Sequence, residues 1–158
     1  MKQIITASIL SLFLMTLAGC GFKVINESEE NNFSIKEITV SGDKRINFKI
    51  KNNLLNYSKK NSRNKLYINL SSRKNKSIKE KNIKNEVTKY QISLYINVSF
   101  KKDNNDKNYL INLIHEGEYL VANSYSTTLN NEKKLIDDLI EHSSERILKK
   151  ISLKLDDI

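Results

Sequence analysis

The most regular hydrophobic pattern in the chain lies between residues 90 and 100. Every second position there is apolar, and the positions between are mostly polar; the apolar set is Tyr90, Ile92, Leu94, Ile96, Val98 and Phe100. This alternation predicts a strand with one face on a core and the other in water. Residues 109–121 resume extended structure after the polar turn of residues 101–108, so the two strands should pair as an antiparallel hairpin.

Two shorter extended segments precede this hairpin. In the first, Phe33 and Ile35 share one phase of alternation while Ile38 and Val40 share the other. This indicates a strand whose change of phase is either a bulge or an end effect, and which ends at the Ser41-Gly42 turn. The second covers residues 65–71 as a short strand. Its apolar pattern then stops, and residues 71–85 should form a long hairpin tip or an extended edge.

Two helices complete the pattern. Apolar residues recur every three or four positions between residues 43 and 60, with Asp43 as N-cap, and an apolar stripe runs along residues 131–155. The predicted order is therefore β-α-β-β-β-α. We expect an α+β fold for residues 33–158, a two-layer sandwich in which two helices pack on one face of a four-stranded mixed or antiparallel sheet.

The N-terminus has the pattern of an exported protein. Lys2 precedes an apolar run over residues 4–17, which is too short to span a bilayer comfortably. Leu17-Ala18-Gly19-Cys20 then matches the bacterial lipobox and resembles a lipoprotein signal. We expect residues 1–19 to be removed, Cys20 to carry a thioether-linked diacylglycerol and an N-acyl chain, and residues 20–32 to form a tether. A free thiol beside an ordinary cleavage site, or in an uncleaved anchor, is the alternative; the chain has no second cysteine for an internal disulfide.

The charge of the chain adds a candidate binding segment. The net charge of +9 becomes +8 without Lys2, and an exported basic surface favours lipid phosphate over nucleic acid as its partner. Residues 71–85 concentrate this charge against one acid, Glu80; the cations are Arg73, Lys74, Lys76, Lys79, Lys81 and Lys84. They either protect a solvated strand edge or contact the phosphates of an anionic lipid. Reversing Lys74, Lys76, Lys79 and Lys81 to glutamate should then weaken lipid binding without changing the melting temperature.

Residues for catalysis are scarce. His115 and His142 do not form an HExxH zinc motif, and no GxSxG nucleophile elbow occurs. A strand would send His115 and Glu116 to opposite faces, and we interpret both as surface polar residues. Glycine is too sparse for a phosphate-binding loop. We predict a protein that is not an enzyme and uses neither metal nor cofactor, although an exported hydrolase remains a third-ranked alternative.

These features together resemble the LptE family of lipopolysaccharide-assembly lipoproteins, in its divergent alphaproteobacterial form. The resemblance rests on Cys20-Gly21-Phe22, on "DKRINFKIKNNLLNYS", on "NEVTKYQISLYINVSF" and on the closing "SYSTTLNNEKKLIDDLIEHSSERILKKISLKL". It implies a plug and assembly partner inside an LptD-like β-barrel that assists lipopolysaccharide transport, anchored at the periplasmic face of the outer membrane. Gly21 stands where aspartate would signal inner-membrane retention. The alternative is an accessory lipoprotein of another envelope lipid-trafficking or secretion system, of the ligand-binding or pilotin type.

Overall fold

A mixed four-stranded sheet forms one layer of the protein. The computed structural model describes residues 33–60 and 62–156, so the predicted signal peptide, Cys20 and the tether lie outside the described residues. The elements, in chain order, are β1 (Phe33–Gly42), α2 (Lys44–Tyr57), β2 (Asn64–Lys81), β3 (Val87–Lys102), β4 (Asn105–Leu120) and α3 (Tyr125–Asp156). The strands lie in the order β1-β2-β3-β4; β1 is parallel to β2, and the other neighbours are antiparallel. The predicted α+β fold and element order are confirmed.

The first strand and helix form as their sequence predicts. The register of β1 on β2 shifts between Ile35 and Glu37, which confirms the bulge. Asp43 caps α2 because its carboxylate accepts hydrogen bonds from the backbone N–H groups of Arg45 and Ile46, each at 3.0 Å. The helix then carries the chain back to start β2 parallel to β1, the crossover that a parallel pair requires.

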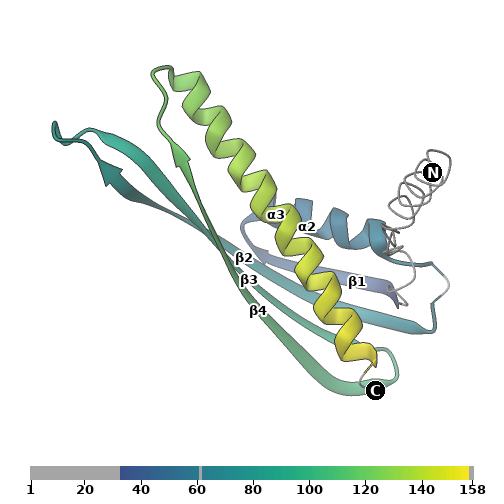
Figure 1. Cartoon of the computed structure of the whole chain (residues 1–158). Coiled ribbons are helices and arrows are strands. Elements are labelled where there is room, and N and C mark those ends of the chain that lie inside the picture. Colours follow the sequence, from purple (N-terminus) through teal and green to yellow (C-terminus); the bar gives the residue numbers. More distant parts are fainter. Residues whose placement is uncertain (1–32, 61, 157–158) are drawn as a thin grey trace, which may run out of the picture.

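Both helices pack on the same face of the sheet and touch each other (Figure 1). Asn53 of α2 donates to the Ser144 hydroxyl of α3 at 3.1 Å. The inner face of the sheet carries rows of buried side chains such as Leu70, Val98 and Ile111, which meet Ile50 of α2 and others of the helices in one core. The opposite, outer face has no helix over it among the described residues, and its rows are rich in Asn and Ser.

Two element boundaries differ from the predicted ones. The short strand expected over residues 65–71 is the first part of an 18-residue strand, because β2 keeps its register on β3 through Ile78, opposite Tyr90. The predicted hairpin tip is thus a long two-stranded arm. Helix α3 starts at Tyr125 instead of residue 131, where the Ser124 hydroxyl accepts a hydrogen bond from the Thr127 N–H at 3.3 Å. The first turn of α3 lacks the apolar stripe from which the rest of the helix was predicted, so hydrophobic periodicity does not indicate this start.

The β2–β3 arm, residues 73–90, projects beyond the end of β1 (Figure 1). Because β2 has 18 residues at about 3.3 Å per residue, the strand is about 60 Å long. Its first residue lies beside Phe33, so the described chain begins at the end of β2 opposite to the arm. Among the described residues no helix is long and apolar enough to cross a membrane.

Candidate functional site

The six cations predicted to contact lipid all lie on the β2–β3 arm, but the strand divides them between its faces. Side chains alternate across a strand, so Lys74 and Lys76 continue the inner-face row of Leu70, whereas Arg73 points to the outer face. The register shifts on both sides of Glu80, near the end of the arm. The arm therefore does not present one continuous basic surface.

The two inner-face lysines pair with Glu132 on α3. The Lys76 ammonium lies 2.6 Å from Glu132 Oε2, and that of Lys74 lies 3.8 Å from Oε1. The Tyr119 hydroxyl donates to the same carboxylate at 2.8 Å. Lys76 also lies over the ring of Tyr90, 4.3 Å from its centroid, and the Tyr90 and Tyr119 rings stack at 5.6 Å. We call Lys74, Lys76, Tyr90, Tyr119 and Glu132 the Glu132 cluster; it fastens the arm to α3.

The electrostatics of the Glu132 cluster keep Glu132 and Lys76 ionised at neutral pH. Burial alone would raise the pKa of Glu132, but hydrogen bonds from Lys76 and Tyr119 outweigh it and hold the pKa below its ordinary value. Burial likewise opposes the charge of Lys76, yet its hydrogen bond to Glu132 raises the pKa of the ammonium group. The Glu132 side chain is only 17% exposed, so the pair is shielded from solvent on one side.

The outer-face cations have different partners. The Arg73 guanidinium stacks over the Tyr95 ring, 4.8 Å from its centroid, and among the described residues no carboxylate pairs with it. Lys79 lies 3.2 Å from Oε1 of Glu118, and Lys89 lies 3.6 Å from Oε2 of the same carboxylate. Arg73 is therefore the outer-face cation with guanidinium hydrogen atoms left for an external anion.

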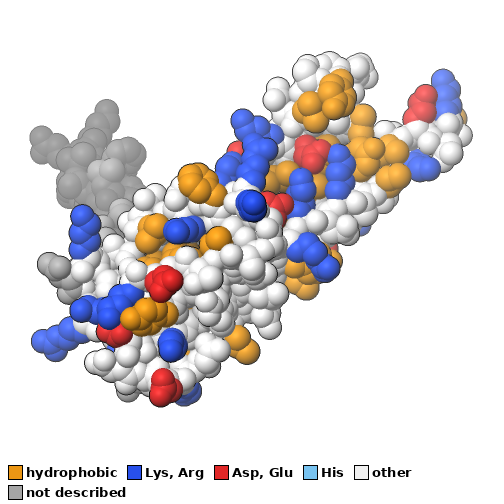
Figure 2. All heavy atoms as spheres, turned by 180° about the vertical axis from the view of Figure 1, so that it is seen from behind, with side chains coloured by type: hydrophobic (Ala, Val, Ile, Leu, Met, Phe, Trp, Pro, Cys, Tyr) orange, Lys and Arg blue, Asp and Glu red, His pale blue; other side chains and the backbone are white. Residues whose placement is uncertain are grey.

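The tip of the arm is a turn built by Asn82. Its side-chain oxygen accepts hydrogen bonds from the backbone N–H groups of Lys84 and Glu86, each at 3.0 Å. The Lys81 ammonium donates to the side chain of Asn85 at 2.9 Å. Ile83, at the apex, is fully exposed. Figure 2 shows the arm at the upper right, with charged side chains gathered at its end. The tip thus places an apolar side chain between Lys81 and Lys84.

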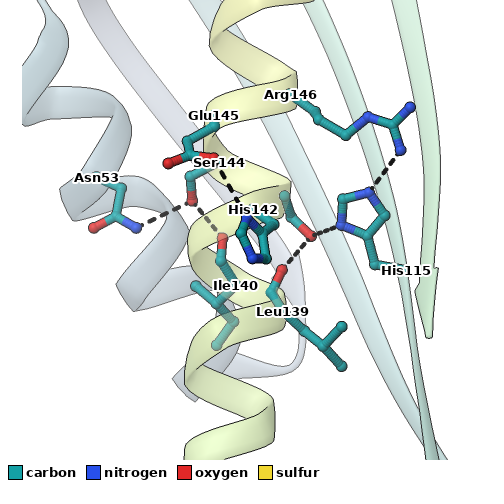
Figure 3. A network of polar contacts seen from close by, with 9 residues as sticks. Asn53, His115, Leu139, Ile140, His142, Ser144, Glu145 and Arg146 are labelled. Atoms are coloured by element: carbon teal, nitrogen blue, oxygen red, sulfur yellow. Dashed lines mark hydrogen bonds and ion pairs between the residues drawn. The ribbon is translucent and has the colours of Figure 1, made fainter. Parts of the chain in front are cut away.

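His115 is half-buried in a contact between β4 and α3, so it has more partners than the surface polar residue that the sequence indicated (Figure 3). Its Nδ1 lies 2.8 Å from the hydroxyl of the fully buried Ser143, which in turn donates to the Leu139 carbonyl at 2.6 Å. Arg146 donates to Nε2 at 3.1 Å. Since Arg cannot accept, Nε2 is the acceptor and Nδ1 carries the proton, so His115 is neutral. Burial, and then the charge of Arg146, lower its pKa.

This arrangement fits packing better than nucleophilic catalysis. The proton of Ser143 is given to a backbone carbonyl, so the hydroxyl does not point its hydrogen at His115 as a nucleophile would point it at its base. His142 is exposed and lies 3.5 Å from Glu145. Within the described part of the chain, no three His, Cys, Asp or Glu residues gather in a way that could hold a metal ion.

Comparison with family models and with curated proteins gave no significant match in sequence. Solved structures do match. Rare lipoprotein B of Shewanella oneidensis has a TM-score of 0.60 and 13% identity, over 77% of this chain and 97% of that one. The fold is that of rare lipoprotein B. Lipoprotein B of Nitrosomonas europaea shares it, with a TM-score of 0.57 and 13% identity over 87% of this chain and 94% of that one. So does a lipoprotein of Caulobacter crescentus, at 0.53 and 10% over 75% and 90%. Rare lipoprotein B is LptE, so the predicted LptE-like fold is confirmed.

In this version of the rare lipoprotein B fold, sequence reasoning named Lys74 and Lys76 but missed Glu132 and Tyr119, with which they hold the arm. Glu132 was one acid among many on α3, and Tyr119 was one apolar position of a strand. One signal was available, because the alternation of Leu66, Ile68 and Leu70 carries on to Lys74 and Lys76. Lysines on the core side of a strand need a carboxylate opposite them, and the start of α3 was the element that could supply it.

Proposed function

We propose that this protein is an outer-membrane lipoprotein of the LptE type, a non-enzymatic plug and assembly partner of an LptD-like β-barrel that assists lipopolysaccharide transport. The observation that carries the proposal is the likeness to rare lipoprotein B, which extends over most of both chains. The lipobox ending at Cys20 supports the lipid anchor. No cofactor is needed for such a role beyond the lipid attached to Cys20.

The shape of the domain suits the inside of a barrel. Lumen walls of large outer-membrane barrels are polar, and the uncovered outer face of this sheet is rich in Asn and Ser. The anchor would be attached through the tether at Phe33, so the arm would point away from the anchored end over the length of β2, about 60 Å. Tethering also raises the effective concentration of the domain beside its partner.

The structure narrows the set of cations that we propose for lipid phosphate. Lys74 and Lys76 are engaged with Glu132, and Lys79 with Glu118. Lys81 and Lys84 stand at the tip beside the exposed Ile83. A phosphate with an acyl chain next to it matches that combination, because ammonium groups attract the phosphate while Ile83 gains by leaving water. Arg73 is a second contact on the outer face.

Purification of the lipidated protein from outer membranes in mild detergent tests the partner. We expect one β-barrel protein to copurify in equal amount, and we expect Cys20→Ala to lower the yield of the complex because the tether is lost. Recovery of the lipoprotein alone would refute the plug role. Recovery with a permease or a secretion channel would support the accessory role instead.

Binding of purified lipopolysaccharide tests the tip. The double substitution Lys81→Gln and Lys84→Gln should weaken binding about 30-fold at low salt, since each lysine contributes about 1 kcal/mol near anionic headgroups. Lys59→Gln with Lys60→Gln is the matched control, because it removes the same charge near the other end of β2. Equal affinities of the two double variants would show that the tip lysines serve only solubility.

A further inference from the structure

Strand β2 has a free edge that begins where β1 leaves the sheet. The last pair between the two strands is Gly42 with Ser72, yet β2 continues to Lys81. From Arg73 to Lys81, the described part of the chain pairs with β2 only on the β3 side. Figure 1 shows the arm extending beyond β1 in this way.

The point where β1 ends is fixed by backbone contacts. Gly42 has a φ of +88°, and a Cβ there would stand 2.2 Å from the Ser72 carbonyl oxygen. The Asp43 N–H donates to that same oxygen at 2.9 Å, and α2 then starts and takes the chain off the sheet. Ser72 is therefore the last residue of β2 whose carbonyl on the β1 side accepts a hydrogen bond from an earlier segment of the chain.

The residues that follow expose hydrogen-bonding groups at this edge. Backbone groups alternate sides along an antiparallel strand, so Lys74 and Lys76 direct their N–H and C=O to the same side as Ser72. No other strand of the described chain covers them there. A free edge of this kind is a template for an additional strand.

The charge on the edge selects the strand that can join it. Residues 73–81 carry five cations against Glu80. Lys74 and Lys76 are paired with Glu132 and Lys79 with Glu118, which leaves Arg73 and Lys81 without a carboxylate partner in the described chain. A second copy of the same edge would place lysine opposite lysine, which disfavours self-pairing. A strand that carries carboxylates meets the opposite sign of charge. The cations thus disfavour a second copy of this edge and favour an acidic strand of another protein.

A groove beside the edge adds an apolar requirement. It has a volume of about 330 Å³ and lies between the start of α2 and the first half of α3, with Lys74 on its border. Ile46, Leu129 and Ile136 contribute apolar wall. The charged lining carries both signs, with cations such as Arg45 and acids such as Asp137, so the groove favours apolar side chains of a ligand and the outer face is left to its carboxylates. An added strand would send alternate side chains toward the helices, so those near Lys74 would enter this groove.

We propose that the edge of β2 from Arg73 to Lys81 binds an extended acidic segment of a partner protein by strand addition, with apolar side chains in the groove and carboxylates on the outer face. Backbone hydrogen bonds at Lys74 and Lys76 hold the segment, and the Arg73 guanidinium pairs with its carboxylates. This site requires neither a barrel lumen nor lipid, and of its named contacts only Arg73 is also a proposed lipid contact, so its failure and that of the proposed function are distinguishable.

The probe is the blocked peptide acetyl-Glu-Val-Glu-Leu-Glu-Val-Glu-amide, added to the mature lipoprotein in neutral detergent. We expect saturating peptide to slow amide hydrogen exchange at Lys74 and Lys76 by about tenfold and to leave Arg73 and Asn75, whose amides face β3, unchanged. A peptide with Lys in place of Glu, and one with Pro at the central position, should give no protection. Absence of protection by the acidic peptide would overturn the proposal.

Two further experiments distinguish strand addition from simple charge attraction. Lys74→Pro removes the outward N–H without removing a β2–β3 hydrogen bond, so it should abolish peptide binding, whereas Lys74→Gln should retain most of it. Equal binding by the Pro variant would refute a backbone contact at this residue. Should that variant not fold, the exchange data on the unmodified protein decide. Inorganic pyrophosphate is the anion control, and equal protection by it would show an anion site instead.

Discussion

Replacing Glu132 tests whether one carboxylate fastens the arm to the rest of the domain. Glu132→Ala removes two short hydrogen bonds, those from Lys76 and from the Tyr119 hydroxyl. Hydrogen bonds to a charged group contribute about 1.5–3 kcal/mol each when their partners stay buried. The Lys76 side chain is 38% exposed and can regain water, so its share is much reduced. Tyr119 is buried, so its hydroxyl cannot replace the lost hydrogen bond with one to water as easily. We expect a loss of about 2 kcal/mol in the free energy of unfolding, which is about 8 °C in Tm for a domain of this size.

Urea unfolding followed by circular dichroism measures this loss, and a cycle with Lys76→Met isolates the pair. Glu141→Gln, at an exposed position of the same helix, is the control and should change stability by less than about 0.5 kcal/mol. The pKa of Glu132 is lowered in the folded state, so its contribution is present above the unfolded pKa of about 4.3 and is lost as the pH falls through the folded value. The difference between Glu132→Gln and the unmodified protein should therefore shrink in acid. A Glu132→Ala protein as stable as the control would refute the role of the cluster.

Three further predictions concern other parts of the fold. Gly42→Ala should destabilise by about 2–4 kcal/mol in urea unfolding, since it combines a positive φ with a backbone clash, whereas Gly117→Ala should cost less because its Cβ would meet only the movable Leu135 side chain. Asp43→Ala should cost about 1 kcal/mol by the same measurement through loss of the α2 cap, and Asp43→Asn should restore most of it. Burial and Arg146 lower the pKa of His115, so the folded protein should lose stability as the pH falls below about 6.5 and toward the folded pKa; a His115→Gln variant with the same loss between pH 7 and 5 would contradict this.

The fold could be predicted from the sequence because most elements follow a simple periodicity. The alternation from Tyr90 to Phe100 defines β3, and the bulge of β1 is visible as the change of phase between Ile35 and Ile38. Periodicity does not determine the start of α3 or the end of β2. Ser124 starts α3 by a local hydrogen bond, and the distal half of β2 is held by pairing with β3. At the start of α3 and at the end of β2, hydrogen bonds determine where the element stops, and no hydrophobic pattern marks the position.

The candidate site was less predictable because it depends on which face each lysine takes. Composition alone grouped six cations into one segment. Strand geometry assigns Lys74 and Lys76 to the helix side, and only the packing of α3 brings Glu132 to them. The same packing places Ser143 and Arg146 on His115. Such partners lie 28 or more residues apart in sequence and have no local signal.

The division of the basic segment changes what charge reversal can test. Reversing Lys74, Lys76, Lys79 and Lys81 together would place two new carboxylates against Glu132 and one against Glu118. Like charges at these distances repel, and the desolvation of Glu132 makes the repulsion stronger. The melting temperature should therefore fall, contrary to the expectation from sequence, and any loss of lipid binding would mix unfolding of the arm with loss of contacts. Reversal confined to Lys81 and Lys84 leaves the Glu132 cluster intact, so a change in lipid affinity there reports on the tip alone.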